Sequence, residues 1–230
     1  MAKKKKEDLE AVEEIEAALT KTEIFIEENQ RMLFIIVGAI FAVVAIYWGY
    51  SKYMDNQNQE AMARMFVAEQ YFERDSFQVA LNGDGTSPGF IEIINNYGSS
   101  KAGNLANYYA GISSLHLGNF DQAIEYLKDF DSDDSMVSSI ALCGIGDAYM
   151  QKENLKDAAS YYMKAASKNE NNFVTPMALL KAGMAYEELG EYHKAVEVYQ
   201  DIKNNFKRST EARKIDKYIT QAKMKQKNKN

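Results

Sequence analysis

The stretch GDAYMQKENLKDAASYY (residues 146–162) decides the fold of the C-terminal part of the chain, because residues 183–199 repeat its layout as GMAYEELGEYHKAVEVY. Three glycines recur at spacings of 35 and 37 residues: Gly111, Gly146 and Gly183. Each is followed after 12 residues by an alanine and after 16 by a bulky side chain: Leu127, Tyr162 and Tyr199. A fixed period of this length is the sign of repeated helical units. Small residues at matching positions predict that the two helices of each unit cross closely.

This layout resembles the tetratricopeptide repeat, a helix–turn–helix unit of about 34 residues. Short turns separate glycine and alanine in each unit: LGNF (117–120), KENL (152–155) and LGEY (189–192). The first unit departs from the pattern, because Ser114 stands where Tyr149 and Tyr186 follow the later glycines. The resemblance implies an all-α solenoid with three units over residues 104–208. A generic helical bundle is the alternative, but it does not predict the repeated spacing.

Two flanking segments complete the expected array. Upstream, residues 51–103 are predicted to form a stalk and a degenerate leading repeat, with helices over residues 57–81 and 88–97. Downstream, residues 209–230 are predicted to form a capping helix, over residues 210–225, and a basic tail. Ser209 would cap that helix, whose apolar face would cover the open end of the array, as terminal repeats generally must.

An uncharged run, MLFIIVGAIFAVVAIYWGY, extends from Met32 to Tyr50. As a helix rising about 1.5 Å per residue it reaches about 29 Å, which matches the roughly 30 Å hydrocarbon core of a bilayer. Thirty-one residues precede it and aromatic residues end it, which favours a retained signal-anchor over a cleaved signal peptide. A buried core helix is the alternative, but such helices usually carry a polar face. We therefore expect residues 32–50 to contact the lipid bilayer.

Counts of lysine and arginine predict the direction of insertion. The residues before the span hold six, including four at residues 3–6, and the 25 residues after it hold three. Because cytoplasmic flanks carry the excess of positive charge, residues 1–31 are expected in the cytoplasm and the repeats across the membrane. Residues 8–28 lack proline and glycine and predict a short acidic amphipathic helix in this tail.

Composition excludes several other classes of protein. The chain is 46% hydrophobic and 26% charged, which is typical of a globular protein, and its single cysteine, Cys143, allows no intrachain disulfide. The net charge is −10 over residues 51–206 (12 basic, 22 acidic) and +7 over residues 207–230 (9 basic, 2 acidic). Such a basic end can contact anionic lipid or RNA. A solvated terminus is the simpler interpretation, and we expect no nucleic-acid partner.

No residue pattern indicates catalysis, a metal or a cofactor. His116 and His193 lie 77 residues apart, with no other ligand at metal-binding spacing. The acidic residues from Asp129 onwards begin like a calcium loop, but they lack its glycine at position 6 and its glutamate at position 12. We therefore expect a protein that is not an enzyme and that binds no cofactor, metal or small-molecule substrate.

Tetratricopeptide arrays bind protein segments in a concave groove, and the resemblance places positions 5, 9, 12 and 13 of each unit in that groove. The predicted groove residues are Tyr108, Ile112, Leu115, His116, Cys143, Asp147, Met150, Gln151, Leu180, Met184, Glu187 and Glu188. This surface would be apolar at one side and acidic at the other. It suits an extended or helical segment with apolar anchors and some positive charge.

The whole layout resembles a bacterial family, the membrane-anchored tetratricopeptide proteins that accompany the Sec translocon. The matching stretches are residues 61–81, residues 90–97, AGNLANYYAGISSLHL (102–117) and DQAIEYL (121–127). The resemblance implies an inner-membrane scaffold whose periplasmic groove binds translocon subunits, periplasmic chaperones or emerging polypeptides. Two alternatives stay open: an adaptor subunit of another envelope biogenesis or secretion complex, and a receptor that faces the cytoplasm.

Overall fold

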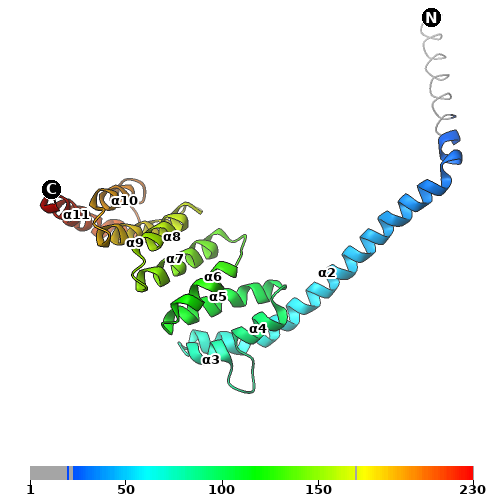
Figure 1. The fold of residues 1–230 in the computed structure, drawn as a ribbon, viewed down its shortest axis with the longest axis horizontal. Coiled ribbons are helices and arrows are strands. Elements are labelled where there is room, and N and C mark those ends of the chain that lie inside the picture. The colour runs from blue at the N-terminus through cyan, green and yellow to red at the C-terminus, as the bar shows by residue number, and fades with distance from the viewer. Residues whose placement is uncertain (1–19, 21–22, 169, 230) are drawn as a thin grey trace, which may run out of the picture. The chain divides into compact units, whose positions relative to one another are not determined.

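A computed structural model describes residue 20, residues 23–168 and residues 170–229, and every regular element in these ranges is a helix (Figure 1). The helices are α2 (Gln30–Glu73), α3 (Phe77–Asn82), α4 (Phe90–Tyr97), α5 (Lys101–His116), α6 (Phe120–Asp129), α7 (Ser135–Gln151), α8 (Leu155–Lys168), α9 (Val174–Glu188), α10 (Tyr192–Asn205), the 3₁₀ turn η1 (Glu211–Lys214) and α11 (Ile215–Lys229). The all-α prediction is confirmed. The acidic helix predicted over residues 8–28 lies largely outside the described residues. The chain divides into two compact units, Met1–Met54 and Asp55–Asn230.

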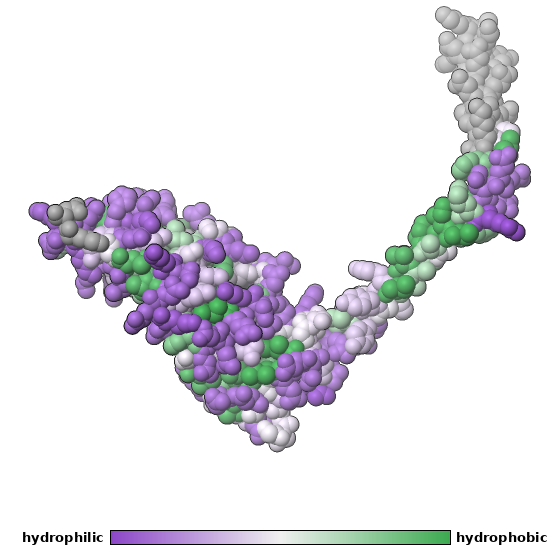
Figure 2. Space-filling model, viewed as in Figure 1, coloured by the Kyte–Doolittle hydropathy of each residue, from purple (hydrophilic) through white to green (hydrophobic). Residues whose placement is uncertain are grey.

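The first unit contains the N-terminal part of α2, which includes the whole predicted span. Every residue from 34 to 50 is exposed, and Figure 2 shows apolar colouring along this part of the helix. Within the described ranges, α2 is the one helix that is long and apolar enough to cross a membrane. A continuous apolar surface of this kind is uncommon on soluble monomers, so this part of α2 is a candidate membrane span.

The second unit is an array of helix pairs. Helix α5 packs on α6, α7 on α8 and α9 on α10, and each pair packs on the next one along the chain. These three pairs occupy the three predicted units. Buried residues form four separate clusters between neighbouring helices instead of one central core. This arrangement is typical of a solenoid, in which each unit contacts only its neighbours.

Each repeat glycine lies against the bulky residue 16 positions further along the chain. A Cβ added to Gly146 would lie 2.5 Å from Cε1 of Tyr162, much closer than ordinary van der Waals contact. The equivalent pairs are Gly111 with Leu127 and Gly183 with Tyr199. The alanines 12 residues after each glycine are fully buried. The helices therefore cross closely as predicted, and the bulky side chain fills the space over the glycine.

The leading segment differs from its prediction. A single helix was expected over residues 57–81, but α2 ends at Glu73 and α3 begins at Phe77. The break follows from the backbone of Asp75, whose φ of 58° lies in the left-handed region and cannot continue a helix. The second part of α2 still packs on α4 and α5, and Asn58 Oδ1 accepts a hydrogen bond from the backbone N of Ala102 at 2.8 Å.

The last helix covers the end of the array with the expected apolar face. Ile215, Ile219 and Ala222 are buried, and they belong to the same cluster as Tyr199 of α10. Ser209 Oγ accepts a hydrogen bond from Ala212 N at 3.1 Å, which begins the 3₁₀ turn η1. The α-helix itself therefore begins at Ile215, later than the predicted residue 210.

Candidate protein-binding groove

A cavity of about 490 Å³ crosses the first helices of three consecutive units. It is lined by Leu115 and His116 of α5, Asp147, Met150 and Gln151 of α7, Lys181 of α9, and Gly118, Phe120 and Tyr162. We call this cavity the groove. It brings together five of the predicted positions, two from the first unit and three from the second. A site that no single unit can form thus depends on the stacking of the array.

The centre of the groove holds an ion pair that joins two units. Lys181 Nζ lies 2.7 and 2.6 Å from the two carboxylate oxygens of Asp147, and both side chains are 33% exposed. The hydroxyl of Tyr162 donates a hydrogen bond of 2.7 Å to the same carboxylate. Burial of Tyr162, together with the adjacent Asp147 charge, raises the pKa of its phenol. The phenol therefore stays protonated and remains a donor.

Aromatic and apolar groups form the rim of the groove. The ring of His116 stacks on Phe77 of α3, with centroids 4.2 Å apart and an interplanar angle of 6°. Leu115 and Met150 are half-buried, whereas Gln151 is exposed. The groove thus presents apolar side chains beside a polar centre. Methionine adapts its shape to different apolar partners.

The third unit presents a second carboxylate in a similar setting. Glu187 accepts a hydrogen bond of 2.9 Å from Tyr199 and one of 2.8 Å from Lys225 of α11. The Glu187 side chain is only 8% exposed. We call each set of acid, tyrosine and lysine a clip: Asp147–Tyr162–Lys181 and Glu187–Tyr199–Lys225. Helix α11 supplies the lysine of the second clip, so the carboxylate of Glu187 is already paired within the chain. The neighbouring Glu188 is exposed.

The other predicted groove residues do not line the cavity. Tyr108 packs against Tyr109 and Phe130, with ring centroids 5.6 and 5.4 Å away. Tyr108 and Ile112 both pack against the buried cluster that contains Leu127 and Ile145. Cys143 is 3% exposed, and burial raises the pKa of its thiol to about 12. Leu180 and Met184 are half-buried on α9. The structure thus separates the predicted set into groove residues and packing residues.

Sequence reasoning missed four residues of the groove: Gly118, Phe120, Tyr162 and Lys181. Tyr162 was assigned to packing alone, although a tyrosine, unlike Leu127, brings a hydroxyl into that position. Lys181 lies 34 residues after Asp147, about one repeat length, which is a signal that the two side chains occupy neighbouring units. Among the described residues, no group of three histidine, cysteine, aspartate or glutamate side chains lies close enough to hold a metal ion.

Comparison with known protein families agrees with the geometry of the second and third units. Two tetratricopeptide-repeat models match the chain, one over residues 140–172 and the other over residues 177–209. The chain contains tetratricopeptide repeats. Both matches fall on the units that carry a clip, and the unit of Gly111 lies outside them. Repeats of this kind are generally protein-interaction modules, which agrees with a groove that crosses several units. None of the curated proteins compared with the chain matches it.

Proposed function

We propose that this protein is a membrane-anchored scaffold that binds segments of partner proteins in the groove. The observation that carries the proposal is the cavity across three consecutive units, because tetratricopeptide arrays use such surfaces for protein interaction. The exposed apolar part of α2 supports anchoring in a bilayer. A tether of this kind raises the effective concentration of the groove near the membrane without any added contact.

The chemistry of the groove favours an extended segment with apolar anchors. Leu115, Phe120 and Met150 offer apolar contact, and Gln151 offers a side-chain amide to a peptide backbone. Asp147 is already paired with Lys181 and Tyr162. Because these polar groups neutralise one another, we infer that the groove holds its ligand and carries out no reaction on it.

The location that we propose is the bacterial inner membrane, with residues 1–31 in the cytoplasm and the repeats in the periplasm. Six lysines and arginines before the span, against three in the 25 residues after it, support this orientation. The resemblance of the whole layout to translocon-associated proteins supports a place beside the Sec translocon. The partners would then be translocon subunits, periplasmic chaperones or emerging polypeptides.

Site-specific photocrosslinking in intact cells tests the groove. A benzophenone side chain at Gln151, which is exposed in the groove, should crosslink to translocon subunits or periplasmic chaperones, identified by mass spectrometry. Glu125 is exposed on α6 and does not line the groove, so it provides the matched control position. Equal crosslinking at both positions would contradict a groove ligand. Recovery of one other envelope complex in fixed stoichiometry would support an adaptor subunit instead.

Protease accessibility tests the orientation separately. In spheroplasts, added protease should digest the repeats, and in inverted vesicles it should leave them intact. Protection in spheroplasts would reverse the proposed orientation and leave a receptor that faces the cytoplasm.

A further inference from the structure

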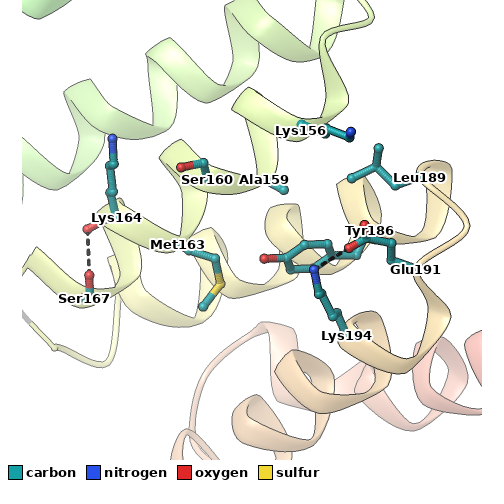
Figure 3. Close-up of a pocket in the computed structure, with 10 residues that line it drawn as sticks. All are labelled: Lys156, Ala159, Ser160, Met163, Lys164, Ser167, Tyr186, Leu189, Glu191 and Lys194. Atoms are coloured by element: carbon teal, nitrogen blue, oxygen red, sulfur yellow. Dashed lines mark hydrogen bonds and ion pairs between the residues drawn. The ribbon is translucent and has the colours of Figure 1, made fainter.

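A second cleft, of about 550 Å³, lies between α8 and the turn that joins α9 to α10. Figure 3 shows its lining residues, which come from α8, from the end of α9 and from the start of α10. It shares no lining residue with the groove. We call it the lysine cleft, because three lysines line it: Lys156, Lys164 and Lys194.

One face of α8 forms a wall of the cleft. Lys156, Ser160, Lys164 and Ser167 follow one another at helical spacing on that face. From Lys156 to Ser167 the wall is about 16 Å long, at about 1.5 Å per residue. An extended peptide rises about 3.3 Å per residue, so this length accommodates about five residues.

The two lysines that α8 contributes to the cleft, Lys156 and Lys164, have no acidic partner. Within the described residues, no carboxylate lies within ion-pair distance of Lys156 or Lys164, and both side chains are exposed. Lys194 is different, because it pairs with Glu191 at 2.7 Å and feels the charge of Glu197. The cleft therefore keeps uncompensated positive charge in a region, residues 51–206, whose net charge is −10.

The inner part of the cleft is apolar. Ala159 is 2% exposed, and Met163, Tyr186 and Leu189 are half-buried beside it. In Figure 3 the ring of Tyr186 lies between the α8 wall and Lys194, whose Nζ is 5.4 Å from the ring centroid. An apolar side chain of a ligand would find contact here, while its charged groups reach the lysines.

We propose that the lysine cleft binds an extended acidic segment of a partner protein. Apolar side chains of the segment pack on Ala159, Met163 and Leu189, and its carboxylates pair with Lys156 and Lys164. Because exposed ion pairs are individually weak and are screened by salt, the complex is weak and sensitive to ionic strength. This inference depends neither on the membrane location nor on the groove. The lysine cleft and the proposed function can therefore be tested, and can fail, independently.

The test is fluorescence anisotropy with the full chain in phosphatidylcholine nanodiscs. The probe is a fluorescein-labelled pentapeptide, Asp-Leu-Glu-Leu-Asp, and the comparison peptide is Asn-Leu-Gln-Leu-Asn. The acidic peptide should bind at least tenfold more tightly, and raising NaCl from 50 to 500 mM should weaken its binding several-fold. The K156E/K164E variant should lose at least tenfold in affinity, whereas K156R/K164R should retain it.

The K217E/K223E variant is the matched control, because it makes the same change of net charge at exposed lysines of α11 outside the cleft. An equal loss in this control would assign the binding to net charge and overturn the site. Equal binding of both peptides, or full binding to K156E/K164E, would do the same. Binding of phosphatidylglycerol vesicles through Lys156 and Lys164, without binding of the peptide, would make the cleft a lipid site instead. Far-ultraviolet circular dichroism checks that each variant stays folded.

Discussion

The first repeat and the two that follow share one glycine spacing but fill it differently. Leu127 covers Gly111 in the first repeat, whereas tyrosines cover Gly146 and Gly183 in the second and third. A leucine and a tyrosine ring both fill the space, but only the tyrosine hydroxyl reaches a carboxylate. The first repeat also lacks the acid, because Ile112 and Leu115 stand at the positions equivalent to Asp147 and Glu187, so it has no clip.

This difference changes how neighbouring repeats are coupled. Each clip takes its lysine from the next helical unit, so it joins two units through charge as well as through apolar contact. Leu127 of the first repeat instead contacts the second repeat at Gly144, where a Cβ would lie 2.9 Å from its Cδ1. Tight packing thus occurs in all three repeats, while the polar contacts between the first and second repeats, Lys128 with Tyr149 and Lys152 with Asp121, involve exposed lysines and form no clip.

The largest effect is expected from adding a methyl group at the third repeat glycine. In Gly183→Ala the new Cβ would lie 2.6 Å from Cζ of Tyr199, whose ring is fully buried and held by Glu187. Overpacking of this kind costs about 1–3 kcal/mol, and we expect a value near 3. Gly111→Ala should cost about 1 kcal/mol, because Leu127 is more flexible than the ring and alanine favours the helix. Thermal unfolding of the full chain in detergent measures both, and equal losses would contradict the comparison.

Removing one hydroxyl tests the clips directly. Tyr199→Phe leaves the nearly buried Glu187 without one donor and should cost about 2 kcal/mol, since hydrogen bonds to charged groups contribute about 1.5–3 kcal/mol. Tyr162→Phe should cost about 1 kcal/mol, because Asp147 is more exposed. Tyr126→Phe, in the first repeat, is the control and should change little. Unfolding curves in urea give the three values, and a loss at Tyr126 as large as at Tyr199 would remove the distinction.

Alkaline pH should weaken the second repeat through its buried thiol. Burial raises the pKa of Cys143 from 9.0 to about 12. Between these values the unfolded chain loses this proton more readily than the folded chain, so stability falls as pH rises. The loss should reach about 1 kcal/mol by pH 10. Melting temperatures from pH 8 to 10.5 should fall less steeply for Cys143→Ala than for the native chain, and parallel curves would show that the thiol does not contribute.

The smallest effects are expected at the ion pairs, in the order of burial of their acids. Lys225→Met should cost about 1 kcal/mol, because Glu187 is nearly buried, and Lys181→Met should cost about half as much. Lys152 pairs with Asp121 of the first repeat, whose side chain is 85% exposed, so Lys152→Met should cost almost nothing. Urea unfolding ranks the three variants. A loss at Lys152 equal to that at Lys225 would show that burial does not govern these pairs.

The sequence predicted the parts of the fold that depend on spacing within one unit. The repeat glycines and their bulky partners lie 16 residues apart on two helices joined by a short turn, and one unit is enough to place them. The clips were not predictable in this way, because Asp147 and Lys181 meet only when two units are stacked at a particular rotation. The break between α2 and α3 was also not predicted, because the left-handed backbone conformation of Asp75 is not indicated by any residue pattern in the sequence.

Not every predicted groove residue lines the cavity, for a related reason. Positions 5, 9, 12 and 13 describe an ideal unit inside a long array, but the units at each end have different neighbours. Tyr108 packs on Phe130, and Glu187 is occupied by α11. The cavity is lined instead by Leu115 and His116 at the end of α5 and by Asp147, Met150 and Gln151 of α7.

The clip between Glu187 and Lys225 gives α11 a second role besides covering the apolar end of the array. The polar contact of α11 is with Glu187 of the unit before it, so α11 could end any array whose last unit is a copy of that unit. Residues 174–210 could be duplicated before it, and the copied unit would offer α11 the same tyrosine and carboxylate. The length of the binding surface is then a property that gene duplication, or an engineer, can change without redesigning the end.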